Sequence, residues 1–263
     1  MTNARSLPDI PEDSLSLYRD QAILGGRIML RQMRCGYRVA VDSVLLAAAF
    51  NIGRDKIPPR QQHIVELGSG VGAGALCLAA RLPELQITGY EIAAELVELA
   101  QYNAAQHNVS ERVEFIQRDI TAYRSSGNPR KFDHVIMNPP FHATSDTPSP
   151  DAARQLAFSL AEFQPWAEAA RYYLRAGGSL TLIFRADGLA ELLAALSPYF
   201  GSFAILPIAP RAEQPAKRII IRAKLGGKSP LRLCAPLILH QMDSNKYTPL
   251  VEGILRDGAV LEF

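Results

Sequence analysis

The sequence predicts an α/β fold in which an open, mostly parallel sheet of seven strands carries helices on both faces. From residue 63 onward, short apolar runs alternate with helix-like segments, the order that builds parallel sheets through crossover helices. A glycine-rich loop follows the first of these runs and leads into the first helix, as in Rossmann-like nucleotide-binding folds. There are too few strand–helix pairs for a barrel of eight repeats.

Residues 1–50 are expected to form an N-terminal extension, and residues 51–263 the main domain. The first 20 residues are polar and contain proline, which predicts a loose arm. Residues 23–24 and 28–30 are apolar and flank two glycines, a pattern that predicts a hairpin. Residues 39–50 are apolar and rich in alanine, which predicts a helix with Asp42 or Ser43 as its N-cap, leading into the main domain.

The main domain is expected to alternate strands and helices in the following order. Apolar runs predict strands at residues 63–67, 86–91, 113–117, 132–137, 179–184, 203–206 and 218–224. Helical spacing predicts helices at residues 74–82, 93–107, 151–174 and 187–196, the third interrupted at Pro165.

Composition narrows the class of protein. With 263 residues and 48% hydrophobic content, the chain can bury a substantial core. It has no apolar run of about 18 residues and no secretory leader pattern, so we expect a cytoplasmic protein without a membrane segment. The three cysteines are far apart and lack metal-ligand spacing, which predicts reduced thiols and no metal site.

Basic residues gather in two stretches, although the net charge is only +2. Residues 14–38 hold five arginines against one acid, and residues 207–232 hold seven basic residues against one acid. Either stretch could be an ordinary solvated face, or it could contact the phosphates of a nucleic acid. Lys217 and Arg218, in the second stretch, are the candidates for RNA contact.

The glycine loop spans residues 66–74 and includes Gly68 and Gly70. Its position after a strand predicts a nucleotide site, but it fits both a dinucleotide and S-adenosylmethionine. Glu91 ends the next strand, where a carboxylate can bind ribose hydroxyls of either ligand. Glu66 favours S-adenosylmethionine, because a carboxylate repels a pyrophosphate and attracts an ammonium group. Asp119, after the third strand, is positioned to accept a hydrogen bond from an adenine amino group, or it is a simple turn cap.

Four residues at the end of the fourth strand predict the chemistry: Asn138, Pro139, Pro140 and Phe141. An aromatic amine is a weak nucleophile, and acceptors for both of its hydrogens favour the geometry that attacks an electrophile. The Asn138 side-chain oxygen and the Pro139 carbonyl are the expected acceptors, held in place by the prolines. Phe141 can stack on a base. The pattern therefore predicts methylation of a planar amine by in-line displacement.

These motifs resemble the class I S-adenosylmethionine-dependent methyltransferases that methylate amines. Residues 36–47, 149–154, 205–207 and 215–218 resemble one bacterial family among them, the valine-tRNA adenine-N6 methyltransferases, and the likeness covers residues 23–250. The resemblance implies that Gly68 and Gly70 border the methionine end of S-adenosylmethionine, Glu91 the ribose and Asp119 the adenine. It further implies that residues 138–141 meet the target base, Asn138 also borders the cofactor, and Asp42 with its neighbours covers the pocket. The implied partner is tRNA, modified next to the anticodon.

Several alternatives stay open at this point. Phe141 followed by His142 also resembles ribosomal RNA guanine-N2 methyltransferases, and related signatures occur in enzymes acting on DNA adenine or protein glutamine. A different class, a dinucleotide-dependent oxidoreductase or a silent nucleotide-binding module, would share the glycine loop. The basic stretches argue against a protein substrate.

Overall fold

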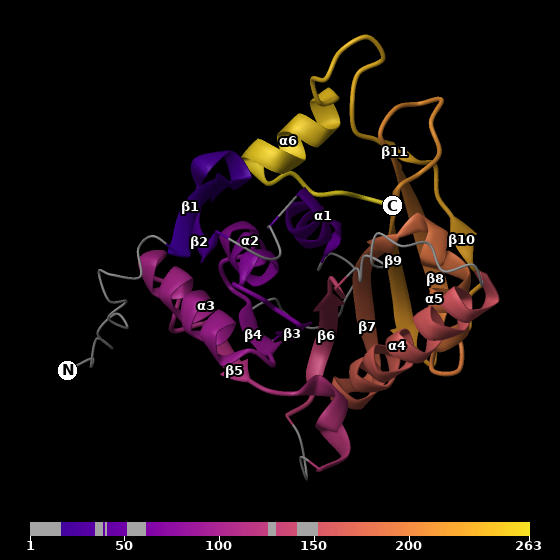
Figure 1. Ribbon diagram of the computed structural model, residues 1–263, viewed down its shortest axis with the longest axis horizontal. Helices are drawn as coiled ribbons and strands as arrows, with labels where there is room; N and C mark the ends of the chain where they lie inside the picture. The colour runs from indigo at the N-terminus through magenta and orange to yellow at the C-terminus, as the bar shows by residue number, and fades with distance from the viewer. Residues whose placement is uncertain (1–16, 35–38, 40, 52–61, 126–129, 141–151) are drawn as a thin grey trace.

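The computed structural model describes residues 17–34, 39, 41–51, 62–125, 130–140 and 152–263, and it confirms the predicted α/β fold (Figure 1). The seven expected strands form the central sheet in the order β8-β9-β7-β6-β3-β4-β5. All neighbours are parallel except β9, which is antiparallel to both β7 and β8. The seven strands are β3 (His63–Leu67), β4 (Gln86–Glu91), β5 (Val113–Gln117), β6 (Phe132–Met137), β7 (Leu174–Arg185), β8 (Phe200–Ala209) and β9 (Arg218–Leu225).

Helices cover both faces of the sheet. One apolar cluster joins α1, α2, α3 and α6 to the sheet, and a second joins α4, α5 and the 3-10 helix η4 to the opposite face (Figure 1). Side chains alternate along each strand, so Ile64 packs in the first cluster and Val65 in the second. The helices are α1 (Val41–Ala49), α2 (Ala73–Arg81), α3 (Ala94–Gln106), α4 (Ala152–Tyr173), α5 (Leu189–Leu196) and α6 (Pro249–Asp257), with 3-10 turns η2 (Leu24–Gly26), η4 (Ile120–Ser125) and η5 (Ala186–Gly188).

The predicted N-terminal hairpin is present and longer than expected. Strands β1 (Tyr18–Ile23) and β2 (Ile28–Met33) pair antiparallel across η2, where Gly25 has a φ of +64°. Residues 18–20, which the sequence assigns to a loose arm, instead belong to β1, and the rest of the predicted arm up to residue 16 lies outside the described residues. The predicted cap of α1 is wrong, because Asp42 and Ser43 lie inside the first turn of the helix.

Two further expectations need correction. Helix α4 continues through Pro165 without interruption. After β9, two short strands, β10 (Arg232–Leu233) and β11 (Leu237–Ile238), extend the β8 edge of the sheet, and α6 follows. Helix α6 was not predicted, although it carries the usual end signals: Pro249 begins it and Gly258 ends it in the left-handed region.

The strand directions determine where a site can form. Because β3, β4, β5 and β6 are parallel, the segments that follow them all emerge at one edge of the sheet. Open α/β sheets bind ligands at this carboxyl edge, near the point where the strand order reverses. Here the reversal lies between β3 and β6.

Candidate active site

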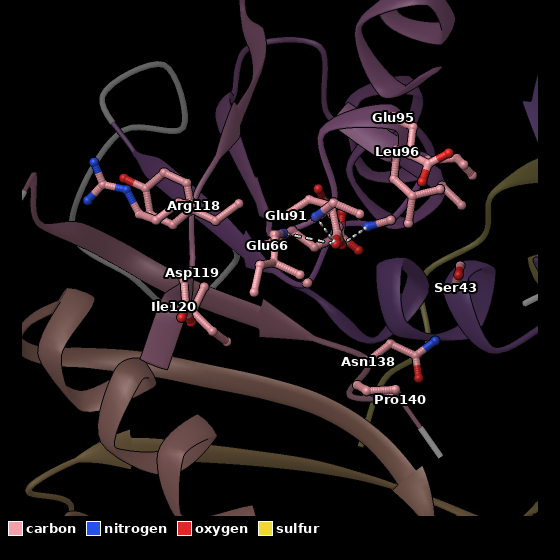
Figure 2. A pocket seen from close by; sticks show the side chains of 18 of the residues that line it. Ser43, Glu66, Glu91, Glu95, Leu96, Arg118, Asp119, Ile120, Asn138 and Pro140 are labelled. Atoms are coloured by element: carbon pink, nitrogen blue, oxygen red, sulfur yellow. Dashed lines mark hydrogen bonds between the residues drawn. The ribbon is translucent and has the colours of Figure 1, made fainter. Parts of the chain in front are cut away.

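A cavity of about 520 Å³ opens at this carboxyl edge, within the range of cofactor sites (Figure 2). Its walls are the glycine loop, the residues after β4, β5 and β6, and the start of α1. Seven of the sequence-predicted site residues line it: Glu66, Gly68, Gly70, Glu91, Asp119, Asn138 and Pro140. The fold therefore brings together residues that are up to 74 positions apart in the sequence.

The glycine loop makes its turn with backbone conformations that side chains rarely adopt. Gly68, Gly70 and Gly72 have φ values of +68°, +53° and +86°. The Gly68 N–H donates to the Tyr90 carbonyl at 2.8 Å, which ties the loop to the end of β4. A Cβ on Gly68 would lie 2.6 Å from the indole of Trp166, so glycine is also needed for the close approach of α4.

Glu91 is a buried carboxylate that organises the loops around it. Its Oε2 accepts the Gly70 N–H at 2.9 Å, and its Oε1 accepts the N–H groups of Ile92 and Ala93 at 2.9 and 3.1 Å. A carboxylate offers about four lone-pair positions, so these three bonds leave one for a ligand hydroxyl. Glu91 thus fixes the glycine loop against β4 and can still face a ribose.

Glu66 lies beneath the loop with its carboxylate almost fully buried. Its Oε2 accepts the Ala75 N–H at 2.7 Å at the start of α2, and Gly74 leaves room for it. Burial raises the pKa of Glu66 to about 8; the nearby Glu91 adds to the rise and the Ala75 hydrogen bond opposes it. The attraction for an ammonium that the sequence predicts requires the ionised form of this carboxyl. Glu66 is largely protonated at neutral pH unless a cation lies close to it.

Asp119 lies where β5 leads into η4. Its Oδ1 accepts hydrogen bonds from the Thr121 N–H and hydroxyl at 2.8 and 2.7 Å, and these bonds lower the pKa of the carboxyl. Asp119 is therefore an ionised turn cap that also lines the cavity. The two roles that the sequence suggested for it are compatible.

Asn138 and Pro140 lie directly after β6, and Figure 2 shows them at the cavity opposite the acidic residues. Pro139 between them is buried, and its ring restricts the freedom of the backbone. Phe141, the fourth residue of the motif, lies outside the described residues.

Two predicted site residues bind each other. The Arg218 Nε donates to the Asp42 Oδ2 at 3.1 Å, which joins β9 to the first turn of α1. The neighbours of Asp42 meet the expectation better, because Val39 and Ser43 line the cavity. Lys217 is exposed beside this pair.

Other arginines of the basic stretches bind parts of the same chain. Arg27 donates to the carbonyls of Asp257 and Ala80, and Arg31 pairs with Asp20. In the second stretch, Arg211 holds a loop by donating to the carbonyls of Gln241 and Ser244, and Arg222 donates to the Phe263 carbonyl. These side chains hold the C-terminal segment and the hairpin in place. Several charges of each basic stretch are therefore engaged within the chain and are not all available to contact phosphates.

The cavity has two walls that the sequence did not reveal. Met33 of β2 contributes from the hairpin, and Trp166 contributes from α4. Trp166 is the single tryptophan of the chain. It packs against Gly68, which lies 98 positions away in the sequence, and no local pattern indicates this contact.

Within the described residues, no group of three or more histidine, cysteine or acidic side chains could hold a metal ion. The same part of the chain contains no helix with the length and hydropathy to span a membrane. Cys77 and Cys234 are free thiols, and Cys35 lies outside the described residues.

The sheet order, the glycine loop and the acidic residues after β4 and β5 define the class I methyltransferase fold. The chain belongs to the methyltransferase small domain family, whose model matches residues 39–207. S-adenosylmethionine is the methyl donor of this class, and the lining of the cavity fits such a donor, because it combines the glycine loop with the acidic side chains of Glu66, Glu91 and Asp119.

Individual relatives differ in what their names say. A tRNA1(Val) (adenine(37)-N6)-methyltransferase of Glaesserella parasuis is 30% identical over 162 residues, which are 60% of this chain and 64% of that protein. The first curated relatives are matched over about half to two thirds of their length. A solved structure of a predicted O-methyltransferase from Agrobacterium tumefaciens is 31% identical, with a TM-score of 0.68 over 84% of this chain and 98% of that chain. The Thermus thermophilus 16S rRNA N2 G1207 methyltransferase shares the fold, at 20% identity and a TM-score of 0.54 over 83% of this chain and 52% of that chain.

Proposed function

We propose that this protein transfers a methyl group from S-adenosylmethionine to the exocyclic N6 amine of an adenine in RNA, with tRNA next to the anticodon as the substrate. One observation carries the proposal: Asn138 and Pro140 open into the same cavity as the glycine loop and the three acidic residues. The residues proposed to bind the methyl donor and those proposed to bind the target amine therefore lie in one site at the carboxyl edge of the sheet.

Each residue has a role in this proposal. Gly68 and Gly70 border the methionine end of the donor, Glu91 holds the ribose, and Asp119 accepts from the adenine amino group. When bound, S-adenosylmethionine supplies an electrophilic methyl group. The protein contributes position and a prepared electrostatic environment, without a covalent intermediate.

On the acceptor side, the Asn138 side-chain oxygen and the Pro139 carbonyl accept hydrogen bonds from the two amine hydrogens. These bonds direct the nitrogen lone pair at the methyl group, and the amine loses a proton after transfer. Phe141, although outside the described residues, keeps its proposed role of stacking on the base. Acceptors for two N–H donors suit an amine and serve no purpose for a hydroxyl substrate, so we favour N-methylation over the O-methylation in the name of the Agrobacterium relative.

Lys217 is the proposed RNA contact, since it is exposed at the carboxyl edge. Arg218 contributes through Asp42, by holding α1 beside the cavity. The choice of adenine in tRNA follows the names of curated relatives. Guanine-N2 methylation of ribosomal RNA is the alternative, supported by Phe141 and His142.

The test is a pair of substitutions at one position. Asn138→Ala removes the acceptor, so the methylation rate should fall at least about 100-fold, as on loss of one oxyanion-hole hydrogen bond. The affinity for S-adenosylhomocysteine, measured by calorimetry, should stay within about twofold. Asn138→Asp keeps an oxygen acceptor and should retain more activity than Asn138→Ala. Equal activity of the two variants, or a cofactor affinity that falls as much as the rate, would show that Asn138 is not the amine acceptor.

A further inference from the structure

The N-terminal hairpin of β1 and β2 reaches the cavity, although it carries none of the residues predicted to bind the cofactor. Met33 at the end of β2 lines the cavity. Three side-chain amides connect the hairpin to two other cavity residues, Val71 and Val39. Figure 1 shows the hairpin beside α3 and α6, away from the sheet strands that carry the predicted motifs.

Asn103 of α3 forms the first connection. It is fully buried, and its Oδ1 accepts the backbone N–H of Arg31 at 2.8 Å. Its Nδ2 donates to the Arg31 carbonyl and to the Val71 carbonyl, both at 3.0 Å. The amide has two N–H donors, so both are used. Asn103 therefore joins the backbone of β2 to the centre of the glycine loop.

Gln32 and Gln21 form the second connection. Gln32 is buried, accepts the Val39 N–H at 3.0 Å and donates to the Gln21 side chain at 2.6 Å. Gln21 donates in turn to the Val39 carbonyl at 3.4 Å. Both backbone polar groups of Val39 are thus bound by the hairpin, two residues before α1 begins.

We propose that the hairpin Tyr18–Met33 is a positioning element of the cofactor site, with Asn103 as the positioning residue. The hairpin, bonded to Val39 directly and to Val71 through Asn103, fixes the separation between Val71 on the glycine loop and Val39 before α1. Both residues line the cavity, so a change in either hydrogen-bond set moves a wall of the site. A cofactor binds more tightly when the walls of its site are held in position before it arrives, which is what such a brace provides. The proposal rests on the proposed function in one respect, namely that the cavity binds S-adenosylmethionine.

Asn103→Asp tests the brace with almost no change of shape. The new oxygen faces the carbonyls of Arg31 and Val71, so two donated hydrogen bonds are lost and two buried acceptors are left unsatisfied. We expect the dissociation constant of S-adenosylhomocysteine to rise about 10- to 100-fold. The rate at saturating cofactor and the KM for RNA should change by no more than about twofold. Hydrogen exchange of residues 68–72 should become faster.

Gln101→Glu is the control for a new negative charge on α3, at an exposed position. Gln101 lies on the same helix and donates to the Phe115 carbonyl at 3.0 Å, outside the cavity. The same amide-to-carboxylate change there should leave the cofactor affinity unaltered. Gln32→Met, which breaks the connection to Val39, is a second variant should Asn103→Asp fail to fold, and it should weaken cofactor binding in the same way.

The outcomes separate the two proposals. If the wild-type protein does not bind S-adenosylhomocysteine, the proposed function fails, and the role of the hairpin fails with it. If the wild type binds but both variants bind equally well, with only the melting temperature lowered, the hairpin is a purely structural element. A loss of affinity in Gln101→Glu as large as in Asn103→Asp would also overturn the proposal.

Discussion

Glu66 offers a quantitative test of the donor site, because its burial couples proton binding to cofactor binding. The pKa of its carboxyl is about 8 in the folded protein. A group with this pKa is about nine-tenths protonated at pH 7. If the ammonium of the methionine moiety binds beside it, the ionised form is favoured and a proton is released.

The size of the effect follows from linkage. The fraction of ionised Glu66 rises close to tenfold between about pH 6 and pH 7, so the affinity for S-adenosylhomocysteine should rise by nearly the same factor. An α-amino group has a pKa near 8 and stays charged over this range, so the ligand adds little pH dependence of its own. Close to one proton should be released per ligand bound at pH 7.

Calorimetry in two buffers of different ionisation enthalpy measures this proton release directly. Glu66→Gln removes the titrating group and retains an oxygen for the Ala75 N–H, so its cofactor affinity should be nearly independent of pH over the same range. If the wild type releases no proton and shows the same pH dependence as Glu66→Gln, the carboxyl does not meet the ammonium. Glu66 would then be only a buried partner of α2.

Three further predictions concern other parts of the molecule. The raised pKa of Glu66 means that stability present at low pH is lost as pH rises from about 4.5 to about 8, by about 3 kcal/mol at pH 7; urea unfolding of the wild type should show this slope and Glu66→Gln should not. Lys217→Ala should weaken RNA binding and reduce the slope of log affinity against log salt by about 1, and an unchanged slope would remove Lys217 from the interface. Trp166 lines the cavity as the single tryptophan, so S-adenosylhomocysteine should change its fluorescence; Trp166→Phe should lose the signal, and an unresponsive wild type that still binds by calorimetry would place the ligand elsewhere.

The central fold could be predicted because its determinants are local. Residues 132–137 are buried along their whole length and are apolar except for Asp133 and His134, so they read as a strand covered on both faces. The glycines at positions 68 and 70 occupy left-handed conformations that few other residues tolerate, which makes the loop recognisable. Because the ends of parallel strands meet at one edge, the convergence of these residues can be predicted without any knowledge of side-chain packing.

What could not be predicted depends on contacts between distant residues. Arg218 pairs with Asp42 and Arg27 reaches Asp257, over 176 and 230 positions, and charge counting gives no sign of either partner. The protonation of Glu66 depends on burial, which the sequence alone does not show. Helix α6 has a clear apolar face but only nine residues, too few for its period to be told from a loop by the sequence alone.

The most direct test of the proposed activity is to identify the methylated nucleoside. RNA from a strain that lacks the protein is incubated with the purified protein and labelled S-adenosylmethionine, digested and analysed by mass spectrometry. We expect label in N6-methyladenosine from the tRNA fraction, and none with Asn138→Ala. Label in N2-methylguanosine, label on a ribose oxygen, or label that persists in Asn138→Ala would contradict the proposed activity.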